Sequence, residues 1–355
     1  MKQPVITLYN GVKMPALVFG TDNMRDEDGA EEIVYQAIKA GYRHIDTAEI
    51  YHNEESIGRA IKRAIKEGIV KREDLFITTK APFSRPGYDE TLNGYDEALK
   101  RLDLEYIDLY LLHHNYTQFH DPRVLAVNSW RAMEKLYMDK RVRAIGVSNY
   151  DDCQYGYAIG QIVWEAFVKP MVNEIQCHPQ YQQKGVVAFC KQKNIAVLCW
   201  GALNQGKIFN VPLYQELANK YHKTITQIAI QWSLQKGYAP IAKSKHVERI
   251  QENLQVGDFV LSDDDMKKLD SLNGGDHSLM HTVNNCLVTN MTIPQFAGFI
   301  QDFKYEQEAI IKFLGMPVLK KKIFGNPFKN CIVKYYLFGI QLIVVNKKGK
   351  TQWKF

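Results

Sequence analysis

The strongest constraint on this sequence is the regular alternation of short β-forming runs with amphipathic stretches between residues 16 and 244. Several runs are apolar at consecutive positions, which is typical of parallel strands covered on both faces. The eight runs are ALVFG (16–20), RHIDT (43–47), LFITTK (75–80), YIDLYLLH (106–113), VRAIGVSN (142–149), MVNEIQC (171–177), IAVLCW (195–200) and YAPIAKS (238–244). The stretches between them, such as EESIGRAIKRAIKEG (54–68), carry apolar residues at helical spacing.

Eight strand–helix units without a break in composition predict a closed barrel. An open doubly wound sheet is the alternative, but no G-x-G-x-x-G motif follows an early strand run, as its dinucleotide-binding version requires. Asn10-Gly11 separates two extended runs within residues 5–18, which predicts a β-hairpin. The predicted fold is therefore α/β: a (β/α)8 TIM barrel with an N-terminal β-hairpin and a C-terminal appended tail.

The end of the chain differs in composition from the barrel region. From Lys304 to Phe355 there are 11 lysines, no arginines and two glutamates, a charge of +9. The whole chain carries +6, so the remainder carries −3 and the basic character belongs to the tail. We expect residues 1–280 to form the barrel, 281–303 a variable loop or linker, and 304–355 a basic, apolar tail whose Gly and Pro favour extended segments.

Three related pieces make up most of this tail: KFLGMPVLKK, KIFGNPFKN and YYLFGIQLIVVNKK. They resemble the Leu-Phe-Gly-Ile-Pro-type tails of enzymes from bacterial surface-polysaccharide pathways. Two interpretations remain open: a segment that docks to a partner enzyme or an anionic membrane surface, or a β-rich addition packed on the barrel or on a second copy. The apolar stretch from Tyr335 to Val345 is too short to span a bilayer.

Composition narrows the class of protein. Hydrophobic residues make up 46% and charged residues 24%, as in a soluble globular protein with a large core. The six cysteines form no C-x-x-C pair, so we expect no disulfide framework and no metal site, and a reducing compartment. The first ten residues hold no apolar run of signal-peptide length. We therefore expect a cytoplasmic protein without a nucleic-acid partner.

Four ionisable residues lie at or just after the ends of neighbouring strand runs. Asp46 closes the second run and Tyr51 follows in the next loop, while Lys80 ends the third run and His113 the fourth. Each alone has an ordinary structural interpretation, as a helix cap, a surface lysine or a satisfied core histidine. Because chemistry in (β/α)8 barrels lies at the C-terminal strand ends, their coincidence favours a catalytic group.

The same residues lie in motifs of a known family. MPALVFGT, GYRHIDTAEIYHNEESIGRAI, LFITTK, LDLEYIDLYLLHH, VRAIGVSNY, NEIQCHP and AKSKHVERIQENLQV occur in order, from about residue 4 to about residue 275. In these motifs the sequence resembles an aldo-keto reductase. The resemblance implies a (β/α)8 barrel closed underneath by the hairpin and a reduced nicotinamide cofactor bound without a Rossmann domain. It also implies a catalytic tetrad of Asp46, Tyr51, Lys80 and His113.

Elementary chemistry is consistent with these roles. Hydride transfer to a carbonyl leaves charge on the oxygen, which needs a proton and a preorganised donor. A phenol with a pKa of about 10 is a reluctant acid. We expect Lys80 to lower the pKa of Tyr51, and Asp46 to hold the lysine charged and in place. His113 would orient the carbonyl oxygen by hydrogen bonding.

The resemblance further implies cofactor-binding residues at the strand ends and in the loops after them. They are Gly20, Thr21 and Asp22 in the first loop, Ser148, Asn149 and Gln176 beside the carboxamide, and Trp200, Gly201 and Leu203 beside the nicotinamide ring. Trp200 stands where the family usually has a stacking Tyr, and an indole offers a larger face for the same contact.

A polar cluster near the end of the barrel region matches the residues with which the family binds the adenosine 2′-phosphate. Lys243, Ser244 and Arg249 form this cluster, with Glu252 and Asn253 near the adenine. Two cations near the start of a predicted helix can pair with a phosphate dianion. The cluster favours NADPH over NADH.

Some positions depart from the family pattern. His114 and Asn115 replace a common Trp and Pro, and Asp22 stands where a Trp is often found. Ala242 replaces the usual Pro before the phosphate-binding lysine. We therefore expect a more polar, less aromatic pocket and a hydrophilic, sugar-like carbonyl substrate.

The predicted function is NADPH-dependent reduction of an aldehyde or ketone, with Tyr51 as general acid. A cofactor-binding regulatory or scaffold protein with little turnover is the alternative, and the tail would suit an assembly role. An enzyme that runs mainly towards alcohol oxidation is a third possibility. The intact tetrad favours the reductase.

Overall fold

The computed structural model describes residues 3–115, 122–150, 157–274 and five strands between residues 306 and 353. The chain divides into two compact units, Met1–His281 and Thr282–Phe355. The variable loop expected at 281–303 lies outside the described residues, as do Cys153, Cys286 and Cys331. The predicted boundaries of loop and tail stay predictions.

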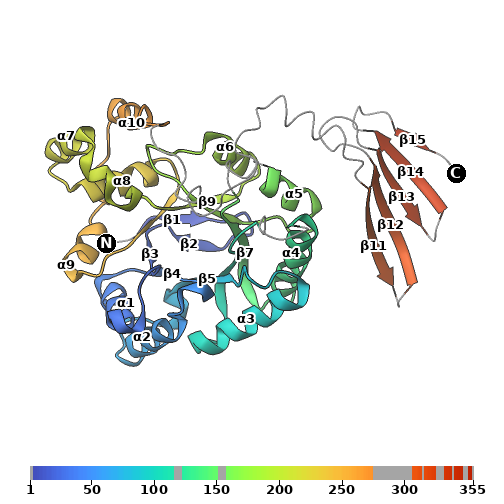
Figure 1. The fold of residues 1–355 in the computed structure, drawn as a ribbon, viewed down its shortest axis with the longest axis horizontal. Helices are drawn as coiled ribbons and strands as arrows, with labels where there is room; N and C mark the ends of the chain where they lie inside the picture. Colours follow the sequence, from blue (N-terminus) through green and yellow to red (C-terminus); the bar gives the residue numbers. More distant parts are fainter. Residues whose placement is uncertain are drawn as a thin grey trace. The chain divides into compact units, whose positions relative to one another are not determined.

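A closed barrel of eight parallel strands forms the centre of the first unit (Figure 1). The strands are β3 (Val18–Gly20), β4 (His44–Asp46), β5 (Phe76–Ala81), β6 (Ile107–Leu112), β7 (Val142–Ser148), β8 (Val172–Gln176), β9 (Ala196–Trp200) and β10 (Ala239–Ala242). Each strand pairs with the next in the chain, and β10 pairs with β3 to close the barrel. The predicted (β/α)8 barrel is confirmed, and the open sheet is excluded.

Gly20 allows the two closing strands to approach each other. A Cβ atom at this position would lie 2.6 Å from the Ile241 side chain, closer than real Cβ contacts come. Glycine in a strand commonly marks such a close approach. The residue that ends β3 therefore has a packing reason to be glycine.

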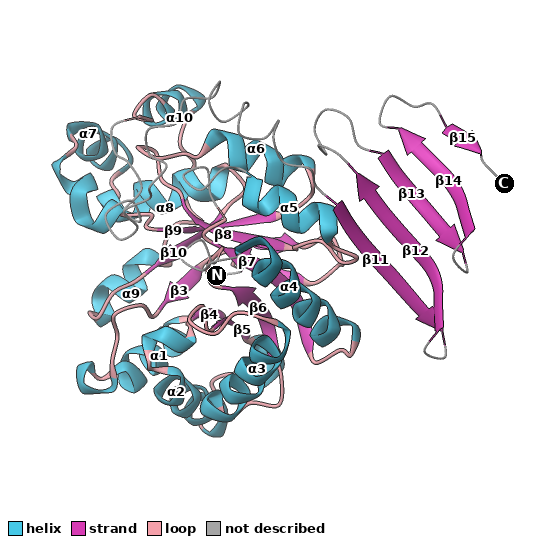
Figure 2. Cartoon of the chain, turned by 45° about the vertical axis from the view of Figure 1, so that its right-hand side comes forward, coloured by secondary structure: helices cyan, strands magenta, loops and turns pink. Residues whose placement is uncertain are grey.

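Helices surround the barrel strands, as Figure 2 shows. They are α1 (Ala30–Ala40), α2 (Glu54–Lys66), α3 (Tyr88–Leu102), α4 (Pro122–Met138), α5 (Tyr157–Glu165), α6 (Lys184–Gln192), α7 (Pro212–Tyr221), α8 (Ile225–Gln235), α9 (Val247–Asn253) and α10 (Asp263–Asp270). Helix α2 shows the logic of their packing, because it buries Ile57, Ala60, Ile61 and Ala64 along one face. Its opposite face carries exposed ion pairs, such as Arg63 with Glu32.

The N-terminal hairpin is present as predicted. Its strands β1 (Val5–Thr7) and β2 (Lys13–Pro15) pair antiparallel. The turn uses Gly11 at a φ of 86°, a left-handed conformation that glycine adopts without strain. Pro15 O lies 2.9 Å from Nδ1 of His44, the first residue of β4. The hairpin therefore lies against the N-terminal end of the barrel.

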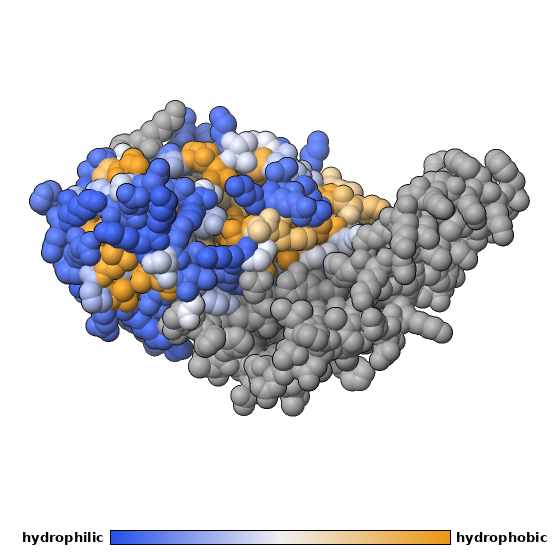
Figure 3. Space-filling view, turned by 90° about the horizontal axis from the view of Figure 1, so that it is seen from above, coloured by the Kyte–Doolittle hydropathy of each residue, from blue (hydrophilic) through white to orange (hydrophobic). Residues whose placement is uncertain are grey.

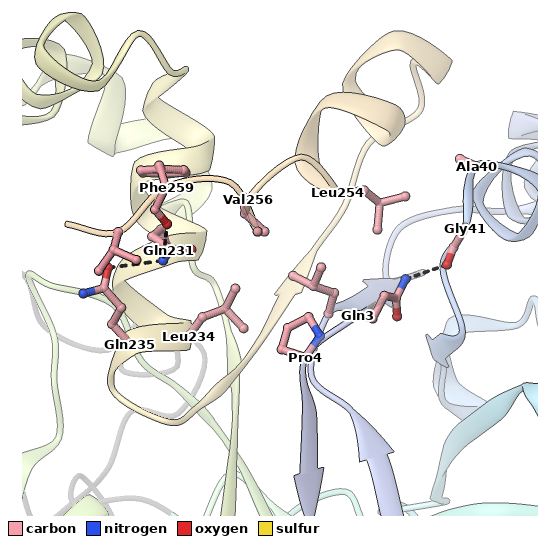
Figure 4. Close-up of a pocket in the computed structure, with 13 residues that line it drawn as sticks. Gln3, Pro4, Ala40, Gly41, Gln231, Leu234, Gln235, Leu254, Val256 and Phe259 are labelled. Carbon is pink, nitrogen blue, oxygen red and sulfur yellow. Dashed lines mark hydrogen bonds between the residues drawn. The ribbon is translucent and has the colours of Figure 1, made fainter. Parts of the chain in front are cut away.

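A cleft of about 440 Å³ opens at this same end (Figure 4). Its lining includes Pro4, Gly41 and Leu234, which lie in the segment before β1 and near the ends of α1 and α8. Those helices lead into the N-terminal ends of β4 and β10. The cleft is therefore remote from the C-terminal strand ends, where the predicted catalytic residues lie.

The second unit contains a five-stranded antiparallel sheet in the order β11-β12-β13-β14-β15. Its strands are β11 (Glu306–Phe313), β12 (Met316–Phe324), β13 (Ile332–Leu337), β14 (Ile340–Asn346) and β15 (Thr351–Trp353). Each strand pairs with its sequence neighbour, so the connections are those of a meander.

The surface of the barrel unit is mixed in character. In Figure 3 most of the visible barrel surface is hydrophilic, with smaller apolar patches between the polar residues. Within the described part of the chain, no helix has both the length and the apolarity needed to cross a bilayer.

Candidate active site

The structure brings the four predicted catalytic residues together at the C-terminal ends of β4, β5 and β6. Asp46 ends β4, Lys80 lies near the end of β5, and His113 directly follows β6. Tyr51 ends the short 3₁₀ helix η2 (Glu49–Tyr51) that follows β4. The ring centres of Tyr51 and His113 lie 5.8 Å apart, edge to face.

A buried ion pair forms the base of this cluster. The ammonium of Lys80 donates hydrogen bonds to both carboxylate oxygens of Asp46, at 2.7 and 2.8 Å, and to Thr47 O at 3.1 Å. Burial acts to lower the pKa of Lys80, but the charges of Asp46 and Glu174 outweigh it, and the net shift is upward. Lys80 is therefore held as a cation, with its nitrogen 5.2 Å from the Tyr51 ring centre.

The pKa of Tyr51 corrects one expectation. Burial raises the pKa of this phenol, and the positive charge of Lys80 lowers it by less, so the net shift is upward. Lys80 acts in the expected direction, but the prediction of a net lowering was wrong because desolvation dominates. Tyr51 is consequently a neutral phenol at neutral pH, which is the form that can donate a proton.

His113 is also neutral. Burial lowers its pKa well below the ordinary 6.5, and the nearby charge of Lys80 lowers it further. A neutral imidazole keeps one N–H group to donate to an oxygen. The side-chain amide of Asn149 donates to His113 O at 3.0 Å, which ties the end of β6 to the end of β7.

A fifth buried ionisable group lies in the cluster. Glu174, in the middle of β8, places Oε1 3.3 Å from Lys80 Nζ, and its side chain is only 3% exposed. Glu174 was not among the site residues predicted from the sequence, because a glutamate inside a strand run does not by itself show which group it faces. A signal was available: Glu174 and Gln176 are two apart and therefore share the inward face of β8.

Asn149 connects two of the predicted cofactor positions. Its side-chain oxygen accepts a hydrogen bond from Trp200 Nε1 at 3.0 Å, and its amide nitrogen lies 3.2 Å from Ser148 Oγ. Asn149 has a φ of 61°, which asparagine tolerates better than most residues. The indole of Trp200 is thereby fixed in place at the end of β9.

The remaining positions at this end of the barrel are close to one another. Gln176 Nε2 lies 3.1 Å from His178 Nε2. Gly201 has a φ of 69°, and a Cβ atom there would lie 3.4 Å from Gln176 Cγ. Leu203 is partly buried against the core. The strand ends of β8 and β9 therefore place an amide and an aromatic face beside each other.

The loop after β3 is tied directly to Asp46. Thr21 donates hydrogen bonds to Asp46 O from its backbone N–H at 3.1 Å and from its hydroxyl at 2.9 Å. The next residue, Asp22, is exposed, and its carbonyl accepts from Lys243 Nζ at 2.9 Å. The loop of Gly20, Thr21 and Asp22 thus links the tetrad to the predicted phosphate cluster.

That cluster lies after β10. Lys243 and Arg249 are both exposed, and within the described residues neither pairs with a carboxylate. Ser244 Oγ accepts from His246 N at 3.0 Å, which shapes the turn before α9. Glu252 is partly exposed and Asn253 is buried near the end of α9. Two uncompensated cations and a hydroxyl are a donor set that suits a phosphate group.

Comparison with known proteins identifies the family. Residues 16–274 match the model of the aldo/keto reductase family. The chain belongs to the aldo/keto reductase family. This match covers the barrel and ends before the C-terminal unit.

Similar aldo/keto reductases have been named and solved. The chain is 41% identical over 281 residues to a 9,11-endoperoxide prostaglandin H2 reductase from Trypanosoma cruzi, a match that covers 76% of this chain and 94% of the relative. A glyoxal reductase from Bacillus subtilis is 40% identical over 269 residues, covering 76% of this chain and 92% of the relative. A Bombyx mori aldo-keto reductase solved in complex with NADP superposes with a TM-score of 0.73 at 31% identity, covering 80% of this chain and 98% of that structure.

Membership of the family makes the chain an oxidoreductase. The described residues contain no group of three or more His, Cys, Asp or Glu side chains arranged to hold a metal ion. Cys177, Cys190 and Cys199 are buried.

Proposed function

We propose that this aldo/keto reductase uses NADPH to reduce an aldehyde or ketone, with Tyr51 as the proton donor. The observation that carries the proposal is the Lys80–Asp46 ion pair, fixed 5.2 Å from the Tyr51 ring centre at the C-terminal end of the barrel. A fixed positive charge beside a neutral phenol favours the phenolate that remains after proton transfer.

The donor set fits the cofactor. Lys243 and Arg249 would hold the phosphate, while the amides of Asn149 and Gln176 suit a carboxamide and the indole of Trp200 suits a planar ring. The NADP complex of the Bombyx mori relative supports the choice of cofactor. When bound, the reduced cofactor supplies the hydride.

The residues of the tetrad carry the proton chemistry. As the carbonyl carbon gains a hydride, its oxygen takes the hydroxyl proton of Tyr51, and solvent later returns a proton to the phenolate. Lys80 stabilises the charge left on Tyr51, and Asp46 keeps Lys80 in position. Neutral His113 donates its N–H to the carbonyl oxygen and orients it.

The substrate we propose is a hydrophilic carbonyl compound. His114 and Asn115 replace aromatic and apolar residues expected at these positions, and their side chains lie 3.2 Å apart. Both residues are mostly buried, and Phe83 lies beside His114 with ring centres 6.0 Å apart. A substrate pocket walled by these three side chains would be mixed in character, and a small polar carbonyl would suit it better than a purely aromatic one.

The test is NADPH consumption with a panel of aldehydes, ketones and keto-sugars, with cofactor binding followed by protein fluorescence. Turnover of polar panel members would support the reductase. Tight NADPH binding without turnover of any member would contradict it and favour the regulatory or scaffold alternative. Faster oxidation of the corresponding alcohols than reduction of the carbonyls would favour the oxidative direction.

We further propose that the C-terminal unit docks the enzyme, acting from the cytoplasm, to an anionic membrane surface or a partner enzyme. The charge of +9 over its residues 304–355 supports this, and the family match ends at residue 274. Sedimentation with anionic liposomes would compare the full chain with one that ends at Phe303. Equal partitioning would contradict the membrane version.

A further inference from the structure

Glu174 is the one ionisable group of the described cluster that has no place in the mechanism above. It reaches the cluster from β8, while Asp46 comes from β4 and Lys80 from β5. All three side chains are 4% exposed or less. The second oxygen, Glu174 Oε2, is buried and accepts no hydrogen bond from the described residues.

The three groups cannot all carry their usual charges without cost. One ammonium faces two carboxyl groups, so full ionisation would leave a net charge of −1 in a buried site. Asp46 accepts two hydrogen bonds from Lys80 and is thus the better stabilised carboxylate. Glu174 has one longer contact, at 3.3 Å, and an oxygen without a donor. A proton on Glu174 removes the excess charge.

We propose that Glu174 is a positioning residue that shares one proton with Asp46 across the ammonium of Lys80, and that loss of this proton slows proton donation by Tyr51. With the proton in place, the three groups are neutral overall and Lys80 can stabilise a phenolate. Without it, an added negative charge opposes the phenolate. This inference rests on the proposed reductase function.

Among the ionisable groups of the cluster, the shared proton is the one expected to titrate at mildly alkaline pH. Burial raises the pKa of Glu174 to about 8, and the charge of Asp46 adds to the effect. The pKa values of Tyr51 and Lys80 are raised above their ordinary values, and that of His113 is lowered well below 6.5. Asp22 contributes a more distant negative charge. On the flanking strands the residues paired with Glu174 are Ser148 of β7 and Leu198 of β9, which do not titrate.

The shared proton can be observed without cofactor or substrate. Infrared absorption of a protonated carboxyl group would be followed in the full-length chain from about pH 6 to pH 10, against Glu174→Gln. We expect a band in the wild type that disappears near pH 8 and is missing from the variant at every pH. Glu134→Gln is the matched control, because Glu134 is also buried but accepts backbone N–H bonds from Phe167 and Val168 near the opposite end of the barrel. Absence of the band from the wild type would overturn the proposal.

The pH profile of kcat tests the effect on chemistry. We expect wild-type reduction to fall as the pH rises past about 8, and Glu174→Gln to keep its activity to a pH at least about one unit higher. Near pH 7 the amide mimics the protonated acid, so the two kcat values should agree within about threefold. Identical profiles would overturn the proposal. If the wild type reduces no carbonyl, the reductase function fails, while the infrared band still decides whether the proton is shared.

Discussion

Both carboxylate oxygens of Asp46 accept hydrogen bonds from a single ammonium group, that of Lys80, at 2.7 and 2.8 Å. A buried ion pair of this kind contributes little net stability, because desolvation offsets the attraction. Its place at the C-terminal end of the barrel is better explained by chemistry. It fixes a positive charge beside Tyr51 that the solvent cannot screen.

Glu174 should partly compensate for the loss of stability when the carboxylate of Asp46 is removed. Replacing Asp46 by Asn is expected to cost less than the ~3–5 kcal/mol typical of breaking a buried pair, because Glu174 can ionise and become the counter-ion of Lys80. The double variant Asp46→Asn, Glu174→Gln leaves Lys80 without a counter-ion. Its loss of unfolding free energy should exceed the sum of the two single losses. Urea unfolding at pH 7 measures all four proteins, and strict additivity would contradict this account.

The pKa of Glu174 also predicts how stability depends on pH. Folding raises this pKa from the ordinary 4.5 to about 8, so between these values the folded chain holds a proton that the unfolded chain has released. The free energy of unfolding should therefore fall as the pH rises through this window, by up to ~1.4 kcal/mol per pH unit from this group. Glu174→Gln removes the contribution. Urea denaturation near pH 5, 6.5 and 8 measures how the free energy of unfolding changes with pH in the wild type and in Glu174→Gln. Equal pH dependence in the two proteins would contradict the prediction.

Much of the fold could be predicted because its signals are local. The run ending at Lys80 opens with three consecutive apolar residues, Leu75, Phe76 and Ile77, as is typical of a covered parallel strand. The C-terminal ends of parallel strands meet at one end of a barrel, which brings Lys80 close to Asp46. The contact between Glu174 and Lys80 could not be predicted in this way. It joins β8 to β5 across the barrel. Neither strand sequence shows that these two side chains are close enough to meet.

The net direction of the Tyr51 pKa shift could not be predicted from the sequence for a related reason. A neighbouring lysine is visible in a motif, but the degree to which the barrel and its loops bury the phenol is a property of the assembled structure. Burial outweighs Lys80 in setting the pKa. The sequence indicates the direction in which burial and Lys80 each shift the pKa of Tyr51, but it does not show which of the two shifts is larger.

The indole of Trp200 should report cofactor binding. If its face lies against the nicotinamide ring, NADPH should quench part of the protein fluorescence, and Trp200→Phe should lose that part. Trp200→Phe also removes the hydrogen bond to Asn149, at a cost of about 0.5–1.5 kcal/mol in stability. Trp164→Phe is the control, because Trp164 is 42% exposed on α5. Equal quenching in wild type and Trp200→Phe would show that the nicotinamide ring does not lie against the indole of Trp200.

The exposed cations after β10 should decide the preference for NADPH. Lys243→Ala or Arg249→Ala should raise KM for NADPH about tenfold with little effect on NADH, because each removes a charge-assisted contact to the 2′-phosphate. Lys245→Ala is a control from the same turn, where Lys245 instead pairs with Asp28 at 2.9 Å. A variant that weakens both cofactors equally would show that the lysine acts through its bond to Asp22.

Single-turnover hydride transfer in Tyr51→Phe tests whether Tyr51 is the proton donor. Enzyme loaded with NADPH would be mixed with the best carbonyl substrate, and the loss of NADPH absorbance followed in wild type and variant. The phenyl ring keeps the shape of the site and removes only the hydroxyl group. The account predicts a rate about 100- to 10,000-fold lower in Tyr51→Phe, with the Kd for NADPH unchanged. Equal rates in the two proteins would show that Tyr51 is not the proton donor.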